Sequence, residues 1–239
     1  MTESIIIELD ILSRIDYFIG LGPEELEVIK RCISPKAIQK GEMFLLEGDR
    51  SDSLYFVISG VAKVYKISTD GRQQIINIAT TGDSLNDVST FDQGQNAANM
   101  VAMTPVLLYG IKKSDLPNIL TKYPQVALNA LKVLAGRVRR DSLLVETLSF
   151  NQVIGRLANT LHKYYVEKTL DGVKLTQQDM ADMIGTSREM VNKSLKIMEN
   201  SGAIRLKRDG IDILDKKTLE EMTVIHATPV RHSKGPDIE

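Results

Sequence analysis

The stretch GTSREMVNKSLKIMENSGAIRL, residues 185–206, carries the most informative pattern in this chain. Its apolar residues recur every three or four positions, which predicts a short amphipathic helix. One side of that helix would hold Arg188, Glu189, Asn192, Lys193 and Lys196. The other side would hold Met190, Val191, Leu195 and Met198. The polar side is either an ordinary solvated surface or a surface that contacts a partner.

Helix-start signals predict two short helices here, at about 177–184 and 187–200, joined by Gly185 and Thr186. Thr176 with Asp179 forms a weak capping box, and Thr186 with Glu189 a full one.

The residues on either side extend this motif. Residues 151–165 predict a preceding helix, and AIRLKRDGIDIL predicts two short strands around Asp209-Gly210, a hairpin signal. A helix, a helix-turn-helix and a hairpin in this order indicate a winged helix.

The second helix of such a motif enters the DNA major groove, and its first turn faces the base edges. Arg and Lys can bind guanine there, and Glu can accept from cytosine N4. Residues 186–208 contain six Lys or Arg and two Glu, although the whole chain has a net charge of −1. This local positive excess is what phosphate contact requires. Contact with DNA is therefore favoured over a merely solvated face.

Residues 37–111 follow a different pattern. Glycines at 41, 48, 60, 71, 82 and 94 separate short apolar segments rich in β-branched and aromatic residues. Thr69-Asp70-Gly71 is a hairpin signal, because Asp and Gly tolerate positive φ. Evenly spaced short strands of this kind predict a small all-β barrel or jelly roll.

Helical spacing precedes and follows the barrel. Residues 10–33 predict helices broken at GLGP, with Pro23 at a helix start. Residues 114–149 predict one helix of about 35 residues, close to 50 Å long. Its apolar seam consists of Ala127, Leu131, Leu134, Val138, Val145 and Leu148, interrupted by Asp141. We interpret this seam as a dimer contact; the alternative is packing on the chain's own barrel.

Bulk composition excludes several classes of protein. The chain has 239 residues and a single cysteine, Cys32, which rules out internal disulfides and cysteine-ligated iron–sulfur centres. Its N-terminus does not resemble a signal peptide, and no apolar run approaches a membrane span. We expect a cytoplasmic protein. GLGPEE lacks the third glycine of a dinucleotide loop, and no other enzyme motif is present, so we expect no enzymatic activity.

The sequence resembles the Crp–Fnr family of bacterial transcription regulators over roughly residues 12–220. TSREMVNKSLKIMENSGAI is similar to the recognition-helix signature of that family, and LTQQDMADMIG, RLANTL and EGDRSDSLYFVISGVAKVYKISTDGRQQII extend the match. The resemblance implies an α+β protein: an N-terminal cyclic-nucleotide-binding-like β jelly-roll barrel, a long dimerisation helix and a C-terminal winged helix-turn-helix. The expected boundaries are 1–113, 114–150 and 151–223, followed by a flexible tail at 224–239.

The resemblance also implies partners: double-stranded DNA with two half-sites about one helical turn apart, a second copy of the chain, and RNA polymerase. Arg188, Glu189 and Lys193 match the positions that read the half-site, with Lys193 in place of the usual Arg. The residues expected to contact DNA are Thr176, Gln177, Thr186, Ser187, Arg188, Glu189, Asn192, Lys193, Lys196 and Lys207. The alternative is a ligand-binding module whose winged helix contacts protein.

The effector is less well defined. Cyclic-nucleotide-binding relatives have a Glu for the ribose and an Arg for the cyclic phosphate; here Asp87 stands near the Glu, and no Arg follows. Cyclic AMP is therefore not expected. The expected effector pocket comprises Gly82, Asp83, Ser84, Leu85, Asp87, Asn96 and Ala97. Haem or another small effector stays open, although His162 reads as structural or surface and Cys32 as a packed apolar residue. No metal ligand set is expected.

Overall fold

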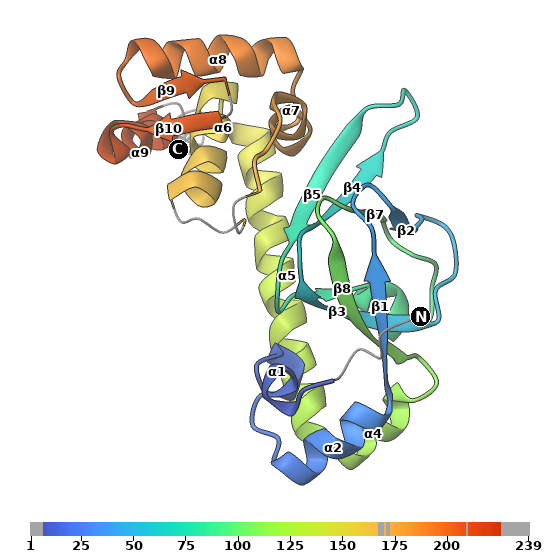
Figure 1. The fold of residues 1–239 in the computed structure, drawn as a ribbon. Helices are drawn as coiled ribbons and strands as arrows, with labels where there is room; N and C mark the ends of the chain where they lie inside the picture. Colours follow the sequence, from blue (N-terminus) through green and yellow to red (C-terminus); the bar gives the residue numbers. More distant parts are fainter. Residues whose placement is uncertain (1–6, 167–169, 171–172, 209, 226–239) are drawn as a thin grey trace, which may run out of the picture. The chain divides into compact units, whose positions relative to one another are not determined.

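The computed structural model describes residues 7–166, 170, 173–208 and 210–225 (Figure 1). Contacts divide the chain into two compact units, one made of 1–143 with 169–174 and the other of 144–168 with 175–239. Most of the predicted tail, 226–239, lies outside the described residues. Each unit has its own core and is described separately.

The first unit contains a jelly roll of two antiparallel sheets, as predicted. One sheet has the order β1-β8-β3-β6, with bounds Ile33–Ile38, Val106–Lys112, Ser53–Ser59 and Ser84–Leu85. The other has the order β2-β7-β4-β5, with bounds Met43–Leu45, Asn99–Ala102, Ala62–Ile67 and Gln73–Ala79. The predicted Asp70-Gly71 turn joins β4 to β5, with Gly71 at a φ of 82°. A short helix that the sequence analysis did not predict, α3 (Asp87–Phe91), follows β6.

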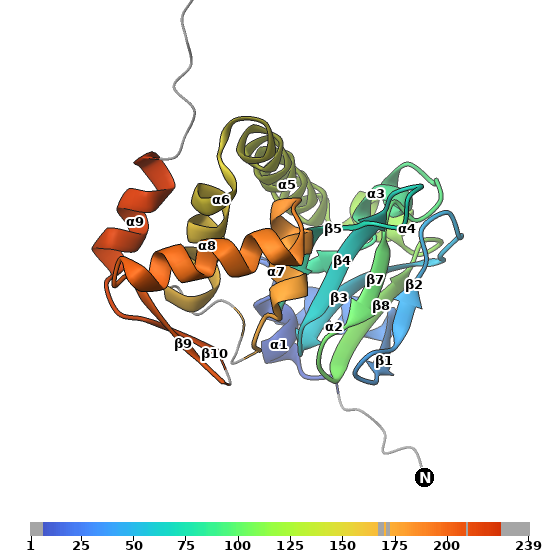
Figure 2. The same ribbon diagram turned by 90° about the horizontal axis from the view of Figure 1, so that it is seen from above.

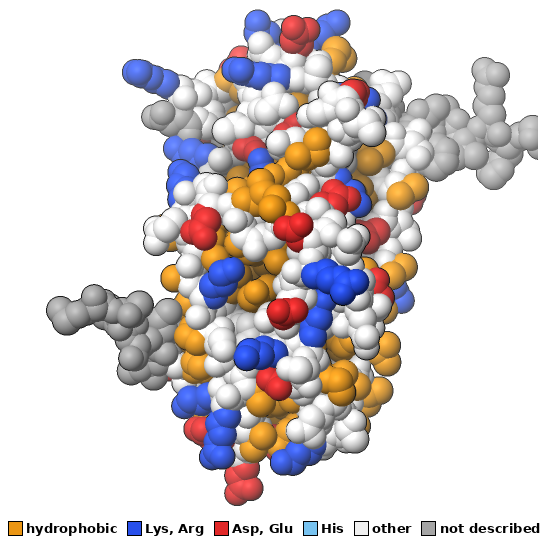
Figure 3. Space-filling model, turned by 90° about the vertical axis from the view of Figure 1, so that its right-hand side faces the viewer, with side chains coloured by type: hydrophobic (Ala, Val, Ile, Leu, Met, Phe, Trp, Pro, Cys, Tyr) orange, Lys and Arg blue, Asp and Glu red, His pale blue; other side chains and the backbone are white. Residues whose placement is uncertain are grey.

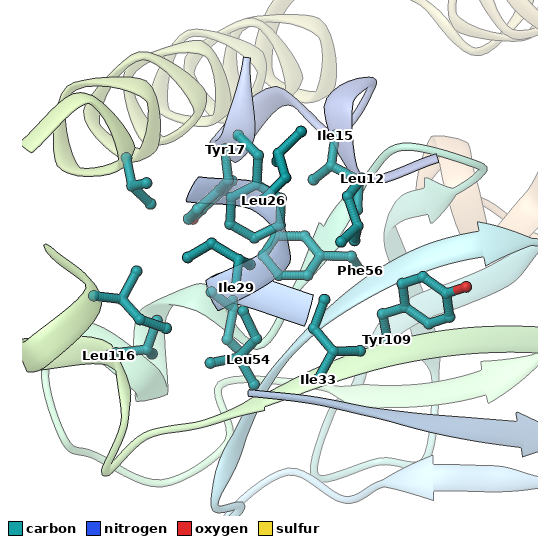
Figure 4. Close-up of a cluster of buried hydrophobic side chains, with 14 of the residues drawn as sticks. Leu12, Ile15, Tyr17, Leu26, Ile29, Ile33, Leu54, Phe56, Tyr109 and Leu116 are labelled. Carbon is teal, nitrogen blue, oxygen red and sulfur yellow. The ribbon is translucent and has the colours of Figure 1, made fainter. Parts of the chain in front are cut away.

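The N-terminal helices cover one end of the barrel. They are α1 (Leu9–Ser13), the 3-10 helix η1 (Asp16–Phe18) and α2 (Pro23–Arg31), which begins at the predicted proline. Tyr17 and Phe18 of η1 each meet Phe56 of β3 edge-on, with ring centroids 5.1 and 5.2 Å apart. Figure 4 shows this apolar cluster, in which Leu12 and Ile29 are fully buried. The cluster fixes η1 against the sheet, and with it the position of Tyr17.

The single helix predicted over 114–149 is wrong. The structure has α4 (Leu116–Lys122) and α5 (Pro124–Phe150), separated at Tyr123. Tyr123 has a φ of −125° and a ψ of 78°. The ring of a proline disfavours the helical conformation for the residue before it, so Pro124 ends α4 and begins α5.

The second unit is a winged helix, as predicted (Figure 2). It contains α6 (Val153–Leu161), a π-helix (His162–Val166), α7 (Gln177–Ile184), α8 (Arg188–Asn200) and the hairpin of β9 (Ile204–Lys207) and β10 (Gly210–Ile213). A further helix, α9 (Lys216–Ile225), was not predicted from the sequence; it packs on α6. The start of α9 could have been predicted from Asp215, a residue type that commonly caps helices. Its Oδ1 accepts from the backbone N–H groups of Lys217 and Thr218.

On the face drawn in Figure 3, Lys and Arg side chains lie interspersed with Asp and Glu, and hydrophobic side chains show between them. No large field of one charge sign is visible on that face. Among the described residues, no helix combines the length and the apolar character needed to cross a membrane.

Candidate functional site

Side-chain caps define the turn between α7 and α8. Thr176 Oγ1 accepts a hydrogen bond from the N–H of Asp179 at 3.0 Å, and the Asp179 carboxylate accepts one from the N–H of Thr176 at 3.1 Å. This is the predicted capping box. α7 ends at Gly185, whose φ of 62° lies in the left-handed region that glycine adopts without a Cβ penalty. The sequence therefore sets both ends of α7 by local chemistry.

The predicted capping box of Thr186 and Glu189 is wrong. The N-cap of α8 is Ser187, whose Oγ accepts from the N–H of Met190 at 3.3 Å. The backbone N–H of Thr186 instead donates to Ala181 O at 3.1 Å, completing the turn that closes α7. Because Glu189 is not used as a cap, its carboxylate stays in solvent.

The polar face of α8 is exposed, as the sequence predicted. Its exposed side chains are Arg188, Glu189, Asn192, Lys193 and Lys196. Among the described residues, no hydrogen bond or ion pair engages these side chains, which leaves them available to a partner. The opposite face buries Val191, Leu195 and Met198 in the unit's core. Met190 was assigned to that buried face, but it is 40% exposed.

The other residues expected at this surface are also accessible. Thr176, Ser187 and Lys207 are exposed, and Gln177 and Thr186 are half-buried. The hairpin is tied to α8 because Glu199 Oε1 accepts from the N–H of Leu206 at 2.8 Å. Lys207 Nζ lies 2.5 Å from Asp212 Oδ2 across the hairpin, so its charge is partly balanced within the wing.

His162 and Cys32 have structural surroundings. His162 Nε2 lies 3.1 Å from Glu220 Oε1, which joins the π-helix to α9. The Cys32 thiol donates to Val28 O at 3.7 Å and packs against the N-terminal core. Burial raises the pKa of that thiol, which lowers its thiolate fraction at neutral pH.

The first unit contains a second polar site, centred on Asp87, which is fully buried at the start of α3. Tyr17 Oη and Ser84 Oγ both donate to Oδ1, the latter at 2.6 Å. Arg137 Nη1 donates to Oδ2 at 2.8 Å, and Arg137 Nη2 donates to Ser84 O at 2.9 Å. The Asp87 carboxylate thereby joins η1, β6 and α5.

Burial raises the pKa of Tyr17, and the neighbouring Asp87 charge and hydrogen bond raise it further. Tyr17 therefore remains a neutral donor to the carboxylate. Neither Tyr17 nor Arg137 was predicted from the sequence; they are 70 and 50 residues away from Asp87. No local spacing links groups so far apart; only the packing of η1 and α5 on the barrel brings them together.

Only some of the residues expected to form one effector pocket lie together: Gly82, Asp83 and Ser84 line the same cavity, beside Tyr17 and Arg137. Ser84 meets Asp87, whereas Leu85 is buried in the apolar interior of the barrel. Asp83 Oδ2 accepts from the N–H of Thr80 at 2.8 Å and stabilises the turn that contains Gly82.

Asn96 and Ala97 lie in the loop between α3 and β7 and are not among the residues hydrogen-bonded to Asp87. Asn96 Nδ2 donates to Leu46 O at 2.9 Å, and its buried Oδ1 has no partner among the described residues. Ala97 is exposed. The position near the phosphate-binding Arg of the family pattern is therefore occupied by a buried, unpaired acceptor.

The predicted seam on α5 is open to solvent. Leu131, Val138 and Val145 are 63%, 65% and 64% exposed, and Leu134 and Leu148 are half-buried. Packing on the chain's own barrel therefore leaves these side chains uncovered. A row of exposed aliphatic residues along one helix is typical of an interaction surface.

Comparison with known proteins covers both units. Residues 35–123 match the family model "Cyclic nucleotide-binding domain", and residues 155–222 match "Crp-like helix-turn-helix domain". A CRP-like cAMP-activated global transcriptional regulator of Mycobacterium tuberculosis is 30% identical over 217 residues, which are 88% of this chain and 97% of that protein.

Two further proteins are similar to this chain, one in sequence and one in fold. A cyclic AMP receptor protein of Thermus thermophilus is 26% identical, over 86% of this chain and 95% of that protein. The crystal structure of a putative transcriptional regulator of the crp/fnr family from Eubacterium rectale matches with a TM-score of 0.72 and 22% identity. That match covers 87% of this chain and 99% of the other, and it supports the same fold.

Proposed function

Because this chain belongs to the Crp–Fnr family of DNA-binding transcription regulators, we propose that it is a homodimer that reads a palindromic DNA site with two copies of α8. The observation that carries the proposal is the exposed and unpaired polar face of α8, held by caps at the tip of a helix-turn-helix. Such a helix places its N-terminal residues against base edges in the major groove.

We assign base reading to the first turns of α8. Arg188 can bind guanine O6 and N7 with two parallel hydrogen bonds, and Glu189 can accept from cytosine N4. Lys193 reaches the same groove one turn later. Glu189 would be repelled by phosphates, and it is not needed as a helix cap. Its place in this turn is best explained by contact with a base.

The exposed seam of α5 supports the dimer. Its aliphatic residues recur at three- and four-residue spacing, so the seams of two copies can pack together. A twofold axis along this contact requires two half-sites, about one turn of DNA apart.

We propose that the effector of this regulator is not a cyclic nucleotide. The Asp87 carboxylate already accepts from three donors of its own chain, which leaves a ribose hydroxyl at most one of its roughly four acceptor sites. Residues 94–99 contain no Lys or Arg for the cyclic phosphate. The unpaired Asn96 Oδ1 is an acceptor, which disfavours an anion nearby. These residues do not fit a cyclic phosphate.

We also propose that the DNA-bound dimer acts on RNA polymerase in the cytoplasm. The effector shifts the dimer between two states, and it can do so only through a difference in its affinity for them. α5 is the element suited to carry this shift, because it contributes residues to both units.

The test is selection of a bound site from randomised duplex DNA, followed by the Arg188→Ala variant. We expect the unmodified chain to select a palindrome with G·C pairs. The variant should lose about 1–3 kcal/mol of DNA-binding free energy and show a relaxed preference at one base pair. Binding should also weaken steeply with salt.

The matched control is Arg139→Ala, which removes an exposed Arg from α5 and should leave the selected site and affinity unchanged. If Arg188→Ala binds the best site as tightly as the unmodified chain, α8 does not read DNA as assigned. If the protein binds no duplex at low salt, with or without added ligands, the winged helix contacts protein instead.

A further inference from the structure

The first unit contains a half-open cavity of about 410 Å³ that lies outside the barrel interior. Its walls come from η1, the turn at 82–84 and one face of α5, so all of it belongs to one unit. Sites for small molecules typically have volumes of roughly 300–1,000 Å³. The Asp87 site lies at its inner wall, since Tyr17, Ser84 and Arg137 line the cavity.

The cavity is rich in cations. Lys132, Arg137 and Arg140 line it from successive turns of α5. Arg137 is engaged by Asp87 and Ser84, whereas Lys132 and Arg140 have no hydrogen-bond or ion-pair partner among the described residues. Gly136 leaves room between them: a Cβ built there would meet only Arg140 Nη1, at 3.9 Å. The cavity therefore has open space beside Gly136.

Two carboxylates also line the cavity. Asp83 uses Oδ2 to accept from Thr80, and Asp16 is exposed at its edge. Because Arg137 is already paired with Asp87, Lys132 and Arg140 stand against Asp16 and Asp83, and the charges of the lining balance. A ligand suited to this lining has an acidic group for the cations and hydroxyl groups that donate to the carboxylates.

The lining face of α5 is not the seam face. Residues 129, 132, 136 and 140 follow one stripe of the helix. At about 100° per residue, Gly136 and Val138 point about 160° apart around the axis. A molecule in the cavity would therefore contact η1, the 82–84 turn and α5 without covering the exposed seam.

We infer that this cavity binds a small hydroxylated organic anion, a carboxylate or a phosphate ester, through Lys132 and Arg140. The inference rests on the proposed function for its consequence: the bound anion fixes α5 against the barrel and is the effector that changes DNA affinity. Arg137 stays on Asp87 and closes the inner end of the site.

The experiment uses the full chain and three probes: citrate, a hexose phosphate and inorganic phosphate, at matched ionic strength. Isothermal titration calorimetry measures binding without DNA. We expect citrate or the hexose phosphate to bind at one site per chain, and Lys132→Ala with Arg140→Ala to weaken that binding by about tenfold or more, because both charge-assisted contacts are lost. Comparing the two organic probes separates carboxylate from phosphate recognition.

Two further variants make the result decisive. Arg139→Ala removes a cation that does not line the cavity, and binding should stay within about twofold of the unmodified chain because surface charge is screened. Gly136→Leu places a branched side chain between Lys132 and Arg140 while keeping every cation; it should weaken binding without lowering Tm, since Leu is the better helix former.

Each outcome tests a different part of the proposal. The cavity site is disproved if neither organic probe binds, if only inorganic phosphate binds, or if the Lys132 and Arg140 change leaves affinity unaltered. If the chain binds the anion but selects no DNA site, the assignment of α8 as the DNA-reading helix is wrong. Anion binding that leaves DNA affinity unchanged would overturn the effector role.

Discussion

The polar face of α8 and the Asp87 site use the same chemistry in opposite surroundings. On α8, Arg188 and Glu189 are exposed, and no partner among the residues that the structure describes engages them. In the barrel unit, Asp87 is fully buried and receives hydrogen bonds from Tyr17, Ser84 and Arg137. The first set of charges is free to meet another molecule, and the second holds three elements of its own unit together.

The difference has energetic consequences. An exposed charge contributes little to folding, because water already solvates it. A buried carboxylate is costly unless it is paired, so every donor around Asp87 matters to the stability of the barrel unit. Changes at Asp87 should therefore alter stability, and changes on α8 should alter binding.

The largest expected effect comes from Arg137→Met. The variant leaves Asp87 buried without its cation, which should lower the free energy of unfolding by about 3–5 kcal/mol. Urea unfolding at neutral pH, followed by circular dichroism, measures the loss. A loss below about 1 kcal/mol, the range of an exposed pair, would mean that the Asp87 pair is solvated and that the contrast with α8 is false.

Adding Asp87→Asn to the same chain provides the internal control. Once the buried negative charge is gone, loss of Arg137 should cost less than it does alone, because contacting groups are not additive. An additive result would show that the two side chains do not interact.

Tyr17→Phe should have the next largest effect. It removes a hydroxyl that donates to a buried carboxylate, which should lower the free energy of unfolding by about 1.5–3 kcal/mol. Tyr123→Phe is the matched control, because Tyr123 is also buried and its hydroxyl makes no hydrogen bond within the described part of the chain. Equal losses in the two variants would place the effect in ring packing.

The raised pKa of Tyr17 adds a pH dependence. Above the unfolded tyrosine pKa of 10.0 the unfolded chain loses the Tyr17 proton while the folded chain keeps it. Stability from this group is therefore fully present below that pH and falls as pH rises beyond it. Tyr17→Phe should make stability less sensitive to alkali, and an unchanged alkaline slope would contradict the assignment.

The two regions also differ in how far the sequence predicts them. The caps of α7, the Gly185 turn and the exposed face of α8 depend on residues within a few positions of one another, so local chemistry specifies them. The strands and the Asp70-Gly71 hairpin were likewise predicted from residues close together in the sequence.

The Asp87 site could not be predicted in this way. Its donors come from η1 and α5, and only folding brings them to α3. The same limit explains why Leu85 and Asn96 do not join Gly82, Asp83 and Ser84 at the cavity. Successive strand residues point to opposite faces, which buries Leu85 in the barrel, and Asn96 bonds to Leu46 instead. The end of α4 at Tyr123, in contrast, could have been predicted from Pro124, the next residue.

A smaller effect tests the corrected cap of α8. Ser187→Ala should lower the free energy of unfolding of the second unit by about 1 kcal/mol, because the N–H of Met190 loses its acceptor. Thr186→Ala, one residue earlier, should cost less than about 0.5 kcal/mol, as for an ordinary surface position. Thermal unfolding of the two variants compares them directly. The reverse order would restore Thr186 as the cap.

The smallest effect sharpens the reading assignment. Lys193 is a point charge where the family pattern has Arg, whose planar fork can bind guanine through two hydrogen bonds. Lys193→Arg should therefore improve discrimination at one base pair by about 1 kcal/mol, and leave stability unchanged because the side chain is exposed. Competition between the selected duplex and single-base variants measures this preference.

Lys216→Arg, an equally exposed change on α9, is the control and should alter neither quantity. A gain in affinity for all sequences alike would assign Lys193 to phosphate contact. A gain confined to one base pair would place it at a base edge. In either case stability should stay constant, because this charge, unlike Asp87, is not committed to the fold.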